Sequence, residues 1–105
     1  MRLLEFNVNA QQIEKAPNCD FSNIVAGTSG YLRAHFTFSS EWDNCIKVAR
    51  FWRGGKEHAV CLHDNECDVP AEVLTGMTFG VSVIGQSETY RITTNRTLIR
   101  QEVNK

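Results

Sequence analysis

The stretch Tyr31–Phe38, YLRAHFTF, decides the fold class of this chain. Apolar and polar residues alternate along it, with Leu32, Ala34, Phe36 and Phe38 on one side and Tyr31, Arg33, His35 and Thr37 on the other. Successive side chains of a β-strand point to opposite faces of a sheet, so this alternation is typical of a half-buried antiparallel strand. We therefore predict a strand here, with its apolar side in the core.

Similar short segments cover much of the remaining chain. Strands are predicted at 3–8, 11–15, 45–53, 56–63, 66–69, 77–84, 89–94 and 96–103. Turn residues separate them, including the pair Gly54-Gly55, the pair Asp64-Asn65 and a turn over 85–87. About seven to nine short strands at this spacing predict an all-β fold, a small antiparallel β-sandwich.

Two segments between the strands have a different character. Residues 16–30 are rich in Gly, Ser, Asn and Pro, and we expect Phe21, Ile24 and Val25 to anchor this irregular segment on the core. Residues 70–74 predict one short helical turn, with Pro70 at its first position and Asp68 as a capping residue.

Size and charge describe an ordinary globular protein. The 105 residues suit one domain spanning 1–105, and the formal net charge is −1. Basic and acidic residues are interspersed along the sequence, which does not favour a nucleic-acid partner. Arg91, Arg96 and Arg100 gather near the C-terminus, and we interpret them as outward positions of two edge strands.

The N-terminus and the cysteines bear on the cellular compartment. Residues 1–6 contain no apolar core of a signal peptide, and no segment approaches the ~20 apolar residues of a membrane span, so we expect no membrane partner. For a chain in a reducing cytoplasm, we expect free thiols rather than disulfides at Cys19, Cys45, Cys61 and Cys67.

No pattern predicts a reaction centre. His58, Cys61, His63 and Cys67 are of the residue types that hold zinc. On a strand, however, Cys61 and His63 share one face while His58 lies on the other, so we predict neither a metal site nor a cofactor. A Cys61–His63 nucleophile would lack a supporting helix, and the common hydrolase, phosphate-loop and dinucleotide motifs do not occur. We expect no catalytic residues and no enzyme activity.

The two tryptophans are conspicuous residues. We expect Trp52 in the core, because its strand also bears Val48 and Phe51, and Trp42 in a loop that covers one end of the sandwich. Either ring could instead form an aromatic platform for a sugar.

Several segments, in order, carry a resemblance to a known group. They are Phe36–Asp43 (FTFSSEWD), Lys47–Phe51 (KVARF), Val60–Leu62 (VCL), Cys67–Leu74 (CDVPAEVL), Phe79–Gly85 (FGVSVIG) and Arg91–Asn95 (RITTN). In this order the chain resembles small virion structural proteins, and N-terminal modules of larger ones, from tailed phages and prophages of Gram-positive bacteria. Such proteins are labelled minor structural, baseplate or head-fibre proteins.

The resemblance implies a non-enzymatic phage virion structural protein. It would be a decoration or adaptor subunit on the capsid or the tail–baseplate apparatus, with other phage structural proteins as partners and symmetric contacts between copies of a homo-oligomer. The expected location is the virion. The candidate interaction surface comprises Tyr31, Arg33, His35, Trp42 and Arg91. Two alternatives stay open: a carbohydrate-binding adhesion module that binds a host glycan, and a small phage-encoded inhibitor of a host defence protein.

Overall fold

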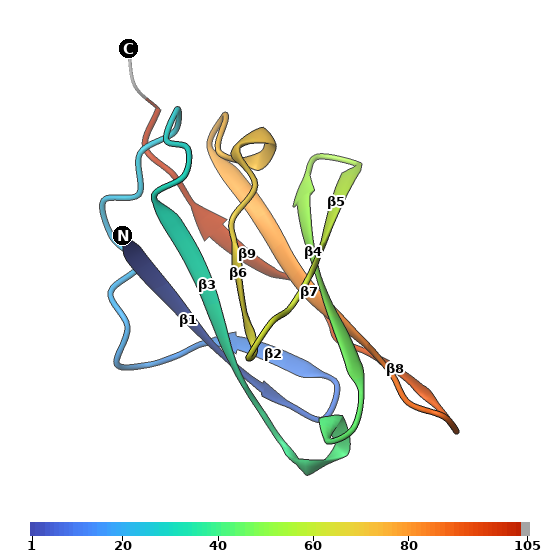
Figure 1. The fold of residues 1–105 in the computed structure, drawn as a ribbon. Helices are drawn as coiled ribbons and strands as arrows, with labels where there is room; N and C mark the ends of the chain where they lie inside the picture. Colours follow the sequence, from blue (N-terminus) through green and yellow to red (C-terminus); the bar gives the residue numbers. More distant parts are fainter. Residues whose placement is uncertain (104–105) are drawn as a thin grey trace.

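Two β-sheets form the described part of the computed structural model, residues 1–103, and pack face to face around a core (Figure 1). The first sheet has the order β2-β1-β3-β6, from strands β1 (Arg2–Asn9), β2 (Gln12–Lys15), β3 (Leu32–Phe38) and β6 (Glu66–Asp68). The second has the order β5-β4-β7-β8, from β4 (Ile46–Arg53), β5 (Lys56–Cys61), β7 (Thr78–Gln86) and β8 (Arg91–Thr93), with β9 (Thr97–Arg100) also paired to β7. The predicted all-β sandwich is confirmed.

The alternation in the sequence sets which side chains form the core. Leu32, Ala34 and Phe36 of β3 are buried, and so are alternate residues of β1 and the apolar residues Phe79, Val81 and Val83 of β7. The stacked rings of Phe6 and Phe36, 5.2 Å apart, join β1 to β3. Burial of these apolar side chains is the main stabilising contribution to such a sandwich.

One strand pair departs from the antiparallel arrangement. β1 and β3 run parallel, with Arg2 opposite Leu32 and Val8 opposite Phe38. The cause is the segment 16–30, which follows β2 in the chain and leads back to the end of the sheet where β1 begins (Figure 1). Parallel neighbours require such a long connection, whereas the antiparallel pair β1–β2 needs only a tight turn.

The segment 16–30 is held by two of its three predicted anchors. Ile24 is 2% exposed, and the ring of Phe21 packs edge-on against Phe6. The prediction for Val25 is wrong, because its side chain is 40% exposed and its backbone instead forms a bridge with Glu102.

Two short 3₁₀ helices complete the described residues, η1 (Ser40–Trp42) and η2 (Ala71–Val73). The second confirms the predicted turn near 70–74, although Pro70 precedes its first residue and Asp68 does not cap it. The predicted turn at 85–87 begins too early. β7 continues to Gln86 because β4 pairs with it on one side and β8 on the other.

Asn95 joins the two sheets along one edge of the sandwich. Its backbone N–H donates to the Gln11 carbonyl oxygen at 3.1 Å, and its side-chain Oδ1 accepts from the Ile13 N–H at 2.8 Å. These bonds hold the chain between β8 and β9 against β2. They also fix the backbone next to Arg96.

Candidate functional site

The five residues of the predicted interaction surface do not lie together. Tyr31 is half exposed just before β3, Arg33 and His35 lie on the outer face of the first sheet, and Arg91 lies on the second sheet. The prediction that Trp42 belongs to an interaction surface is wrong, since its side chain is fully buried.

Packing and a hydrogen bond explain the burial of Trp42. Its indole Nε1–H donates to the Ala10 carbonyl oxygen at 2.9 Å, and its ring packs on Phe38 at 5.1 Å. A Cβ atom added to Gly85 would lie 2.7 Å from the Trp42 ring, so this glycine leaves the space that the ring fills. Trp42 thus closes one end of the sandwich and offers nothing to a ligand.

The outer face of the first sheet keeps Arg33 engaged with its own carboxylates. Arg33 donates to Glu66 at 2.8 Å and to Asp68 at 2.7 Å. The hydrogen bond to Glu66, more than any other contact, raises the pKa of Arg33. His35 Nδ1 lies 3.7 Å from a carboxylate oxygen of Glu5.

These residues define the first-sheet face, which is acidic. The face comprises Glu5, Glu14, Arg33, His35, Glu66 and Asp68, all at outward register positions. Four carboxylates against one arginine leave it a formal charge of −3 with histidine neutral.

The outer face of the second sheet carries Trp52, contrary to its predicted place in the core. Phe51 points inward and is buried, so its neighbour Trp52 must point outward on the same strand. The indole Nε1–H donates to the Ser82 hydroxyl at 3.0 Å. The guanidinium groups of Arg50 and Arg96 lie over the ring, 5.2 and 3.9 Å from its centre.

Gly80 makes this stack possible. It lies opposite Trp52 on the neighbouring strand β7, and a Cβ atom there would be 2.6 Å from Arg96 Cδ. Because glycine has no side chain, Arg96 can cross the sheet close to the backbone and reach the ring.

Both guanidinium groups of the stack keep hydrogen-bonding capacity. Within residues 1–103, Arg96 has no hydrogen bond or ion pair, and Arg50 Nε is buried without a hydrogen-bond partner. The carboxylate of Glu57 lies 3.6 Å from Arg50 Nη1. An attraction between cation and aromatic ring therefore positions these side chains without using their donors.

We call this surface the arginine–tryptophan face; it comprises Arg50, Trp52, Glu57, Ile84, Arg91, Arg96, Leu98 and Arg100. Four arginines against one glutamate give it a formal charge of +3. The predicted outward positions of Arg91, Arg96 and Arg100 are confirmed. Charges that are interspersed along the sequence are thus separated in space.

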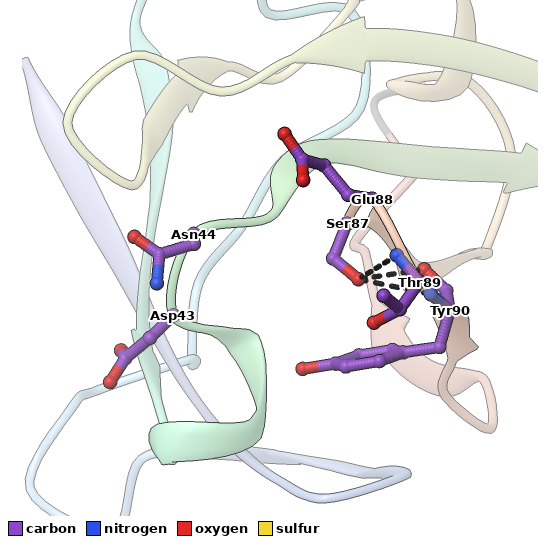
Figure 2. Close-up of a pocket in the computed structure, with 6 residues that line it drawn as sticks. All are labelled: Asp43, Asn44, Ser87, Glu88, Thr89 and Tyr90. Atoms are coloured by element: carbon purple, nitrogen blue, oxygen red, sulfur yellow. Dashed lines mark hydrogen bonds between the residues drawn. The ribbon is translucent and has the colours of Figure 1, made fainter.

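A shallow depression lies between the loop after η1 and the turn joining β7 to β8. Figure 2 shows Asp43 and Asn44 on one side of it and residues 87–90 on the other. The Ser87 hydroxyl accepts from the backbone N–H of Thr89 and of Tyr90, and the Tyr90 hydroxyl donates to the Glu41 carbonyl oxygen. These groups serve to hold the turn against the loop, and so the depression is a weaker candidate site.

The four cysteines are free thiols, as predicted. Burial raises the pKa of the Cys67 thiol to about 12, so this group is not a nucleophile at neutral pH. Among residues 1–103, His, Cys, Asp and Glu side chains form no group of three or more that could hold a metal ion, and the set His58, Cys61, His63 and Cys67 does not converge.

Comparisons add no relative to these observations. Neither protein-family models nor curated proteins nor solved structures give a match to this chain. Within the described residues, no helix has the length and apolar character needed to cross a membrane.

The chemistry of the arginine–tryptophan face suits contact with a protein. Tryptophan and arginine are the residue types that carry most binding energy in protein interfaces. A sugar platform needs an open aromatic face, whereas the Arg96 guanidinium lies over Trp52. The sequence interpretation missed this site because it grouped Trp52 with Val48 and Phe51, two residues whose odd separation places them on opposite faces of a strand.

Proposed function

We propose that this protein is a non-enzymatic structural protein of a phage virion, a decoration or adaptor subunit of the capsid or the tail–baseplate apparatus. It attaches to its partner through the arginine–tryptophan face. The observation that supports attachment by this face is the stack of Arg50 and Arg96 on the partly exposed Trp52. The virion setting is supported by the ordered sequence motifs that resemble phage structural proteins.

The stack of Arg50 and Arg96 on Trp52 is already ordered in the free chain. Ser82 fixes the indole by a hydrogen bond, Gly80 admits Arg96, and the Asn95 bonds fix the neighbouring backbone. Side chains that are already ordered lose little conformational entropy on binding, which favours affinity. A partner surface rich in carboxylates would complement the arginines.

The test is the protein content of particles from the phage or induced prophage that encodes this chain. Gradient-purified particles are analysed by quantitative mass spectrometry, and we expect the chain in a fixed ratio to the major capsid or tail proteins. Absence from particles that contain the other structural proteins would contradict the proposal.

Variants locate the attachment surface. We expect Arg96→Ala and Trp52→Ala to reduce the amount of chain on the particle about tenfold or more, because truncating a central interface anchor typically costs 2 kcal/mol or more, about thirtyfold in affinity. Lys56→Ala is the matched control for Arg96→Ala, because it also removes one positive charge. Lys56 is exposed and lies opposite Arg53 in the backbone register of the hairpin, away from the ring of Trp52. Equal loss with the control would contradict attachment by this face.

A further inference from the structure

We propose that the partner of the arginine–tryptophan face is the first-sheet face of a second copy of this chain. This inference rests on the proposed function and names one partner for its binding surface. Copies would associate head to tail, each using its basic face toward one neighbour and its acidic face toward the other.

Charge complementarity within one chain selects this arrangement. The two outer faces carry formal charges of +3 and −3 on a chain whose net charge is only −1. Contact between two basic faces, or between two acidic faces, would place like charges together, which costs several kcal/mol. A contact between unlike faces places opposite charges together.

Each face carries a charged side chain that forms no ion pair among the described residues of the monomer. Arg96 has no ion pair within residues 1–103, and neither has Glu14 on the opposite side of the molecule. The 58% exposed Leu98, and the part of Trp52 that the two guanidinium groups leave exposed, add apolar area that water covers in the monomer. Charged groups would therefore align the two copies while burial of Trp52 and Leu98 supplies affinity.

The dimensions of the molecule allow a stable contact of this kind. The described residues extend over 48 × 29 × 21 Å, so a broad face has room for the roughly 800 Å² per partner of a standard interface. Because the sheets pack face to face, their outer faces point in opposite directions (Figure 1). A repeated contact between different faces adds copies one after another, as in a ring or an open stack.

Two charge-reversal variants test the two faces separately. The basic-face variant is Arg96→Glu with Arg100→Glu, and the acidic-face variant is Glu5→Lys with Glu14→Lys; all four residues are exposed. None of them belongs to the Arg33 ion pairs, so both variants should fold, which circular dichroism and thermal unfolding verify.

Sedimentation velocity at low salt and up to millimolar concentration measures association. We expect the wild type to form species larger than a dimer, and each variant alone to associate at least about tenfold more weakly. An equimolar mixture of the variants should associate more strongly than either variant alone, because the intact acidic face of one variant can contact the intact basic face of the other.

Three results would overturn the inference. These are a monomeric wild type at every concentration, a wild-type dimer that grows no further, and variants whose mixture does not associate. Binding of a polyanion such as heparin by a monomeric wild type would assign the basic face to another class of partner. The chain could still be found on purified particles in each case, so the proposed function and this inference fail separately.

Discussion

The inner and the outer face of the second sheet each hold a large side chain close to the backbone, and each depends on a glycine of β7 to do so. On the inner face, Gly85 leaves room for the ring of Trp42, 2.7 Å from the position of a Cβ atom. On the outer face, Gly80 leaves room for Arg96, which then covers Trp52. The inner contact is sealed in the core, whereas the outer contact faces water with unused hydrogen-bond donors.

The difference shows how a strand divides its residues between stability and binding. Gly80 and Gly85 lie five positions apart, an odd number, so they must lie on opposite faces. The same backbone therefore supports a core contact and a surface stack at once. Paired substitutions on the two faces separate these roles.

The largest expected effect distinguishes the two tryptophans. Trp42→Ala should lower the free energy of unfolding by about 3–5 kcal/mol, because it removes a fully buried ring and leaves the Ala10 carbonyl oxygen without its hydrogen-bond donor. Trp52→Ala should cost less than about 2 kcal/mol, since that ring is partly exposed. Urea unfolding measures both. Equal losses would show that the two faces contribute alike to stability.

The two glycines should show a smaller effect in the same direction. In Gly85→Ala the new methyl group meets the ring of Trp42 and Cys45 in the packed interior, which should cost about 1–3 kcal/mol. In Gly80→Ala it meets the flexible side chain of Arg96, which can move away. We expect little loss of stability there but a changed Trp52 fluorescence and weaker partner binding. A larger stability loss for Gly80→Ala would refute this ranking.

A pH series extends the comparison to the inner face of the first sheet. Burial raises the pKa of Cys67 to about 12, against roughly 8.5 when unfolded, so the folded state holds this proton more tightly. The resulting stability is present below pH 8.5 and is lost as the pH rises toward 12, by up to about 1.4 kcal/mol per pH unit.

Cys67→Ala isolates that contribution, because wild type and variant share every other titrating group. The stability difference between them should shrink as the pH rises above 8.5, measured by urea unfolding at each pH. At pH 8 the exposed Cys61 should react readily with a thiol reagent while Cys67 stays protected. A constant difference across the series would contradict the burial assigned to Cys67.

The smallest effect compares the arginines of the two outer faces. Arg33→Ala leaves Glu66 and Asp68 without their cation, so stability should fall slightly and the loss should shrink with added salt. Arg96→Ala breaks no ion pair among residues 1–103 and should leave the salt dependence of the melting temperature unchanged. Identical salt dependence in the two variants would contradict the different settings of these arginines.

The sequence predicted the strands well where alternation is long and regular. The segment Tyr31–Phe38 and the apolar positions of β1 and β7 indicated both the strands and their buried sides correctly. It predicted the site poorly. Trp42 covers one end of the sandwich as predicted but lies buried rather than on the interaction surface, and Trp52, which was expected in the core, lies on an outer face. Strict use of the two-residue period from the buried Phe51 would have placed Trp52 outward.

By itself, the sequence determined the fold class and the two sides of each strand, because side-chain direction in a strand follows from local backbone geometry. Only the tertiary structure decided which strands became neighbours, including the parallel pair β1–β3 and the arrival of Arg96 over Trp52. It also collected dispersed charges into one basic and one acidic face. Such groupings join residues distant in the chain, and the local pattern of each segment carries no information about its partner in space.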